Sequence, residues 1–222
     1  MTGDEANEVF AIIRRVGPVV MSSAMTQPFS AGAALRRAVG MMIADKSMTD
    51  LSVFCFAFKV CTDLARHCGA TLVTMDRVRK AALKEKPQSL PATLVVMAIV
   101  RLTLATEARI LAYMTFRSRD EVEDIAVQMH AAFSETTEIA ADDLDAGTFA
   151  ALVALHGAVT VHLADNGRRL PRVIAYKNQT VLPALRMAQR TYADPVRYVE
   201  LIDENEVVHP AFMPLEGKML AV

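Results

Sequence analysis

The chain has 222 residues, a net charge of −1 and 53% hydrophobic residues, with few aromatics and no Trp. The balanced charge excludes recruitment to nucleic acid or a membrane by bulk electrostatics, and three cysteines exclude a disulfide framework. Because the apolar mass is mostly Ala, Leu, Val and Met, the composition favours helices packed on helices. The length allows one large domain or two small ones.

Residues 1–30 are predicted to form a short helix followed by an irregular arm. Residues 6–16 have amphipathic spacing, and Gly17 with Pro18 is expected to stop the helix there. Residues 19–27 have neither charge nor a clear period, so the arm is expected to reach a neighbour and order on binding. The acidic N-terminal start is the wrong charge for a signal peptide, which predicts a protein made in the cytoplasm.

Residues 31–165 are predicted to form a helical bundle. The first helix, at 31–43, should turn Leu35, Val39 and Met42 inward, and the second, at 51–66, is apolar almost all round. A basic helix follows Thr74, and Pro91 can open the longest helix, at 93–116. Its apolar core at 92–100 is well short of the ~20 residues that a membrane helix needs, so no membrane helix is predicted.

The last two bundle helices have clear apolar stripes. Ser118 with Glu121 forms a capping box before the first, and Asn166 with Gly167 ends the second. The expected stripes consist of Val122, Ile125, Ala126, Met129 and Phe133 on one helix, and of Phe149, Leu152, Val153, His156, Val159 and Leu163 on the other.

Residues 166–222 are predicted to be a small α+β module. Residues 172–177 suit a strand, 182–190 a helix and 219–222 a second short strand. Between them, Asp194 is a natural N-cap and Pro195 suits the first helical position. The remaining expectations are a helix face of Val196, Val199 and Ile202, a left-handed Asn205 as its end, and a tight turn at Gly217.

The same C-terminal residues carry a family resemblance. They run Tyr192-x-Asp194-Pro195-x-Arg197, then Glu200-Leu201, Asn205, His209-Pro210-x-Phe212-x-Pro214 and Gly217-x-x-Leu220. This order resembles the C-terminal end of the Mu-like bacteriophage DNA-circularisation proteins and, more loosely, the LysM-like modules of contractile-tail baseplate proteins. The resemblance extends more weakly to about Ser118. The β-rich N-terminal domain typical of that family has no counterpart here, which predicts a split protein or a retained helical half.

No catalytic or metal-binding set is evident in the sequence. Cys55, Cys61, His67 and Cys68 have gaps of six and seven residues, unlike the close ligand pairs of zinc sites, and buried structural cysteines explain them better. His156 is interpreted as a core histidine, and His209 as part of a structural turn. The predictions are therefore no metal, no cofactor, no small-molecule substrate and no enzymatic activity.

Charge is segregated along the C-terminal half. Residues 117–145 carry nine acids against two arginines, whereas residues 166–190 carry six bases and no acid. Such blocks can pair with each other or with copies of the chain, or be a solvated basic surface. Nucleic-acid binding by residues 166–190 is the alternative function, although only Tyr176 and Tyr192 could stack on bases.

The sequence thus predicts a mainly α fold, a helical bundle with a small C-terminal α+β, LysM-like module that acts as a docking knob. The resemblance implies a structural component, wedge or hub, of a phage tail baseplate around the tail tube, located in the virion. Its expected partners are other tail proteins and copies of itself, without a membrane, and a small helical enzyme ranks last. The suspected docking residues are Arg168, Arg169, Arg172, Tyr192, Asp194, Arg197, Asn205, His209 and Phe212.

Overall fold

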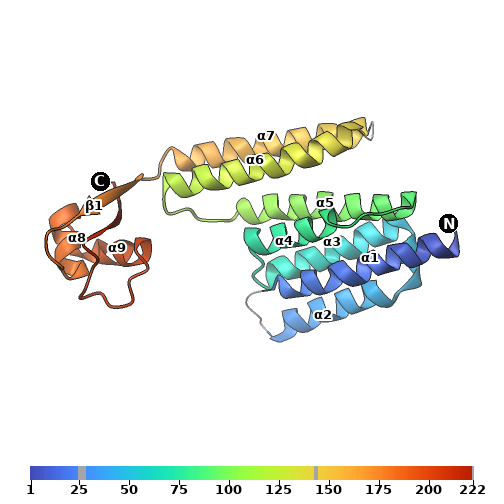
Figure 1. The fold of residues 1–222 in the computed structure, drawn as a ribbon, viewed down its shortest axis with the longest axis horizontal. Coiled ribbons are helices and arrows are strands. Elements are labelled where there is room, and N and C mark those ends of the chain that lie inside the picture. Colours follow the sequence, from blue (N-terminus) through green and yellow to red (C-terminus); the bar gives the residue numbers. More distant parts are fainter. Residues whose placement is uncertain (25–28, 143–144, 222) are drawn as a thin grey trace. The chain divides into compact units, whose positions relative to one another are not determined.

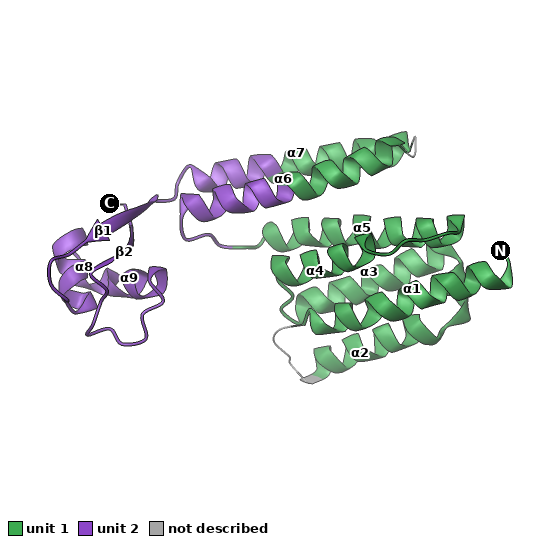
Figure 2. Ribbon diagram, in the orientation of Figure 1, with its two compact units in different colours: residues 1–114, 130–159 green, residues 115–129, 160–222 purple. Residues whose placement is uncertain are grey.

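A computed structural model describes residues 1–24, 29–142 and 145–221. The chain divides into two compact units, coloured separately in Figure 2. Unit 1 comprises Met1–Met114 and His130–Val159, and unit 2 comprises Thr115–Met129 and Thr160–Val222. The fold is mainly helical with one small antiparallel sheet, which confirms the predicted fold class.

Unit 1 is a bundle of helices that lie side by side (Figure 1). Its buried core draws on every one of the first five helices, and it includes Ile12, Leu35, Phe54, Phe58, Met75 and Ile99. The helices that lie wholly in this unit are α1 (Gly3–Ser22), α2 (Phe29–Ala44), α3 (Leu51–His67), α4 (Leu72–Leu83) and α5 (Leu90–Leu111), with a short 3-10 turn η1 (Lys46–Thr49) before α3.

The predicted stop at Gly17-Pro18 is wrong, because α1 continues through both residues to Ser22. Proline removes one backbone donor, but Val16 and Val20 are buried on either side, and their burial offsets that loss. Gly17 serves packing: a Cβ there would stand 2.8 Å from the Ile43 side chain of α2. The predicted irregular arm is thus helical as far as Ser22, and residues 25–28 of it lie outside the described residues.

The inward positions of α2 and the opening of α5 follow the prediction. Leu35, Val39 and Met42 are buried, and Pro91 lies in the first turn of α5 behind the N-cap Ser89. Helix α3 is less enclosed than its composition suggested, because Phe56 on its outer side is exposed. Helix α5 ends at Leu111, earlier than the predicted residue 116.

Helices α6 (Arg119–Asp142) and α7 (Ala146–Gly167) each contribute residues to both units. On α7, Leu152, Val159 and Leu163 are buried as predicted, whereas Phe149 and Val153 are exposed, so that part of the predicted stripe is wrong. Among the described residues α7 is also long and apolar enough to span a membrane by length and composition. No membrane-length apolar segment was predicted here, because histidines and small residues interrupt the apolar run in the sequence.

Unit 2 contains the C-terminal module. Its elements are β1 (Val173–Lys177), α8 (Ala184–Tyr192), the 3-10 turn η2 (Pro195–Arg197), α9 (Tyr198–Glu204) and β2 (Glu216–Leu220). The strands pair antiparallel, with Val173 opposite Leu220 and Tyr176 opposite Gly217. Met187, Tyr192, Leu201 and Met213 form the centre of its core.

Three local predictions in this module are corrected. Val196 and Val199 are exposed and Leu201 is buried instead, because a 3-10 turn precedes α9 and shifts the helical phase. Asn205 has φ −111°, and the positive φ falls on Glu206. Gly217 lies within β2 rather than in a tight turn.

Candidate docking surface

Tyr192 and Arg197 are predicted docking residues that the structure places inside the module. Tyr192 is buried, and its hydroxyl accepts a hydrogen bond from the Leu220 N–H of β2 at 3.1 Å. The Arg197 guanidinium lies over the Tyr192 ring at 4.0 Å and donates two hydrogen bonds to Glu200, at 2.7 and 3.0 Å. These bonds raise the pKa of Arg197. The pair therefore ties α8, η2 and β2 together.

Asn205 joins α9 to β2. Its amide nitrogen donates to the carbonyl of Leu201 at 2.8 Å and to that of Lys218 at 2.7 Å. Its amide oxygen accepts from the Lys218 N–H at 2.8 Å. One side chain thus completes the edge of a strand and satisfies a carbonyl near the helix end, which explains the choice of Asn without a left-handed backbone.

Asp194 caps η2, as predicted, by accepting a hydrogen bond from the Val196 N–H at 2.9 Å. Replacing Asp194 with alanine is expected to destabilise unit 2 by about 1 kcal/mol, because that N–H loses its partner. Hydrogen exchange at the Leu220 amide would report the change. Asp194→Asn is the matched control, since it keeps the cap, and equal destabilisation by both variants would contradict the capping role.

Two segments of unit 2, residues 178–185 and 207–215, run beside each other and are called the docking loops. Backbone hydrogen bonds join Asn178 N–H to Leu215 O, Met213 N–H to Leu182 O and Ala184 N–H to Pro210 O, at 2.7, 3.1 and 2.7 Å. Neither segment contains Lys, Arg, Asp or Glu. The large apolar side chains that they expose are Val181, Leu185, Val208, Phe212 and Leu215.

Phe212 and His209 are the predicted site residues that belong to this surface. Phe212 is 68% exposed, and its ring centroid lies 5.2 Å from that of His209. The His209 Nδ1 atom accepts a hydrogen bond from the Ala211 N–H at 3.3 Å, which fixes the turn. Exposed apolar side chains clustered on a well-bonded turn are typical of a protein interface. The prediction missed Leu215, and it missed Val181 and Leu185 because the segment that carries them is joined to that of Phe212 only by pairing between distant parts of the chain.

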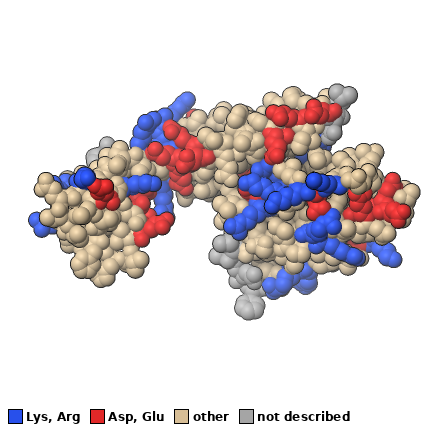
Figure 3. Space-filling view, viewed as in Figure 1, with Lys and Arg blue, Asp and Glu red and all other residues tan. Residues whose placement is uncertain are grey.

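The three arginines of the predicted site lie after α7, away from the core. Arg168 has a weak contact with Asp165 at 3.5 Å, and Arg172 contacts Glu123 of α6 at 4.0 Å. Arg169 is exposed. Basic and acidic side chains lie next to each other where α6 begins and α7 ends (Figure 3). The two charge blocks therefore meet partly within unit 2, through exposed and individually weak pairs.

Unit 2 also has an open groove of about 680 Å³ between the start of α6 and β1. Asp120 closes one side of it, and its carboxylate accepts a hydrogen bond from the Val173 N–H at 2.7 Å. The groove is lined by carboxylates and aliphatic side chains, including Glu121, Asp124 and Ile174, and also by the basic Arg117 and Lys218. Within the described ranges no three His, Cys, Asp or Glu residues are grouped to hold a metal.

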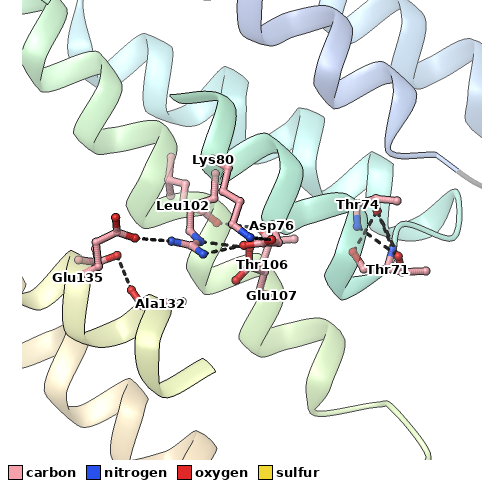
Figure 4. A network of polar contacts seen from close by, with 11 residues as sticks. Thr71, Thr74, Asp76, Lys80, Leu102, Thr106, Glu107, Ala132 and Glu135 are labelled. Carbon is pink, nitrogen blue, oxygen red and sulfur yellow. Dashed lines mark hydrogen bonds and ion pairs between the residues drawn. The ribbon is translucent and has the colours of Figure 1, made fainter. Parts of the chain in front are cut away.

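A second polar cluster, in unit 1, was missed by the sequence analysis. Arg79 belongs to the predicted basic helix after Thr74, and its side chain is only 5% exposed. It binds Asp76 at 2.6 Å and Glu135 of α6 at 2.9 Å, and its Nε lies 3.7 Å from Glu107 of α5 (Figure 4). Burial raises the pKa of Glu107 to about 8, while the Arg79 charge opposes the rise. One cation therefore joins three helices.

The structure also shows how far His156 and the three cysteines are buried. His156 is half-buried rather than in the core as predicted, and it stacks on Phe133 with centroids 4.9 Å apart. Burial lowers its pKa. Cys61 and Cys68 are buried, as predicted for structural cysteines, and Cys55 is half-buried. Burial raises the pKa of Cys61 to about 11, so its thiol is a poor nucleophile.

Comparison with known proteins adds no family to these observations. No protein-family model matches the chain, and neither does any curated protein sequence.

Proposed function

We propose that this chain is an assembly component of a phage tail baseplate, in which the docking loops of the C-terminal module bind a neighbouring tail protein. The observation that carries the proposal is the exposed apolar surface around Phe212, held on a turn by backbone hydrogen bonds. The phage assignment comes from the resemblance of the C-terminal residues. The docking role comes from the chemistry of the surface.

The internal bonds of the module support the same role. The polar groups of Tyr192, Arg197 and Asn205 form hydrogen bonds with neighbouring backbone and side-chain atoms of the module. A small module with a two-stranded sheet has little core, so these bonds add the rigidity that a preformed docking surface needs. The residues of the resemblance thus divide into those that build the module and those, His209 and Phe212, that it presents.

Replacing Phe212 and Leu215 together with serine is the direct test. We expect the variant to fold normally, because both side chains are exposed, and to be depleted at least about tenfold from purified tails. Quantitative mass spectrometry of tails from virus carrying the variant would measure this. Leu90→Ser, at an exposed apolar position of unit 1, is the matched control and should be incorporated normally. Normal incorporation of the double variant would refute the docking role.

DNA binding remains a second candidate, favoured by the exposure of Arg168 and Arg169. Binding of duplex DNA by the purified chain that weakens steeply with salt would support it, because phosphate contacts release counterions. Loss of that binding in an Arg168→Gln/Arg169→Gln variant would assign it to these residues. One observation weighs against DNA binding: Arg172 already lies next to the acidic Glu123.

A further inference from the structure

Helix α7 is apolar around its whole circumference, but only one side of it is covered. Its composition and length would suit a membrane span, and only 17% of its most apolar window is buried. Leu152, Val159 and Leu163 fill the covered side. A helix that is apolar all round is normally buried on several sides. The exposed side of α7 therefore has the composition of an interface.

The exposed side carries a regular row of residues, called here the outer face. It consists of Ala150, Ala154, Gly157, Val161 and Ala164, all of them exposed. Their spacing of four and three residues is that of the facing positions in paired helices. The helical repeat of 3.6 places this row opposite the buried side. Small side chains let two helix axes approach closely, and the larger Phe149 and Val153 flank the row.

Gly157 lies at the middle of the outer face, where its backbone is open to a close neighbour. A Cβ added there would meet nothing within 4 Å. Glycine in a helix interior costs about 1 kcal/mol relative to alanine, so an exposed one is unfavourable in an isolated helix. A close crossing of two helices at this position would require it. Ala150 and Ala164 lie seven residues to either side, so an antiparallel copy brings each opposite the other.

The charges at the two ends of α7 distinguish between orientations. Asp145 directly precedes α7, Asp142 ends the neighbouring helix α6, and Arg168 and Arg169 follow the last residue of α7. In Figure 3 acidic side chains gather toward the α6–α7 connection and basic ones toward the end of α7. A parallel pair would set acid against acid. An antiparallel pair centred on Gly157 sets Arg168 beside the start of the other helix, and it also opposes the two helix dipoles.

A groove of about 290 Å³ lies between the start of α6 and the end of α7. Its apolar floor includes Val122, Ala126 and Leu163, and Arg119, Glu123 and Arg168 form its rim. The same antiparallel arrangement brings Phe149 of the second copy to the level of residue 165, beside this groove. The groove gives that exposed ring an apolar surface to cover.

We infer that the outer face of α7 is the contact between two copies of this chain, paired antiparallel about Gly157. The inference deepens the proposed assembly role and rests on it for its biological purpose. The pairing itself can be tested with the purified chain alone. It supplies a self-association surface distinct from the docking loops, which face a different partner.

Sedimentation equilibrium of the purified chain tests the pairing. The wild type is expected to show a concentration-dependent dimer of the 24.2 kDa chain. Ala154→Arg places a charge in the middle of the face and should raise the dissociation constant at least about a hundredfold. Met41→Arg adds the same charge to an exposed apolar position of α2 and should leave the dimer intact. Circular dichroism would show that both variants remain helical.

A charge reversal tests the orientation. Arg169→Glu should weaken the dimer about tenfold, because the antiparallel register sets position 169 opposite Asp145 of the second copy and the change replaces an attraction with a repulsion. A monomeric wild type would overturn the pairing, and so would equal effects of Ala154→Arg and Met41→Arg. Co-flotation of a monomeric wild type with phosphatidylglycerol vesicles would assign the face to a membrane instead. None of these outcomes changes the Phe212/Leu215 incorporation test, so the two ideas fail separately.

Discussion

Replacing Arg79 with methionine is expected to destabilise unit 1 by about 3 kcal/mol, the largest single effect that the structure predicts. Methionine keeps much of the volume but removes the cation between Asp76, Glu107 and Glu135. Urea unfolding of the purified chain would measure the loss. Arg77→Met, on the exposed side of the same helix, is the matched control and should change stability by less than about 0.5 kcal/mol.

The pH dependence of unit 1 follows from Glu107 in the same cluster. Its pKa in the folded chain, about 8, is above the ordinary value of 4.5, so the folded state holds a proton that the unfolded chain releases. Stability from this group is fully present below about pH 4.5 and is lost as pH rises toward 8 and beyond. Glu107→Gln should remove this dependence and stabilise the chain by about 2 kcal/mol at pH 8.5, with little effect at pH 5. An equal effect at both pH values would contradict the assignment.

Replacing Gly217 with alanine is expected to destabilise unit 2 by about 2 kcal/mol. An added Cβ would come within 2.7 Å of the Tyr176 hydroxyl and closer still to the Asn205 amide oxygen, which accepts from Lys218 N–H. One of these groups must move and break its bonds. Loss of protection of the Lys218 amide in hydrogen exchange would report the change.

Gly40→Ala provides the comparison for that substitution. A Cβ at position 40 of α2 meets nothing within 4 Å, and alanine favours a helix more than glycine does. The same change should therefore stabilise unit 1 slightly, by about 0.5 kcal/mol. If Gly217→Ala stabilised its unit, as Gly40→Ala is expected to, the close approach of Asn205 to the β2 backbone would not be the reason for glycine at position 217.

The helices and caps of this chain were predictable because they depend on local signals. Apolar spacing placed α2 and α6, and Asp194 with Pro195 marked the start of η2 correctly. Local rules failed where distant contacts decide. Pro18 did not stop α1, because the burial of Val20 outweighs one lost hydrogen bond, and the phase of α9 shifted because a 3-10 turn precedes it.

The candidate surfaces were only partly predictable, for the same reason. Phe212 stood out in the sequence as a bulky residue between prolines, but Val181 and Leu185 of the paired segment lie 31 and 27 residues earlier. Arg79 belongs to the basic run after Thr74, and nothing in that run indicates its burial against Glu107 of α5 and Glu135 of α6. Phe149 and Val153 of α7 were predicted to face inward and are exposed, because the sequence of a single helix does not show which side its neighbours cover.

The proposed assembly role is tested most directly by quantitative mass spectrometry of fractionated virus particles, from the phage that the proposal takes as the source of this chain. The account predicts that the chain is present in the baseplate fraction at a fixed ratio to the other tail proteins. It also predicts that the Phe212→Ser/Leu215→Ser chain is missing from that fraction while it remains folded in the lysate. Absence of the wild-type chain from purified particles would contradict the central claim.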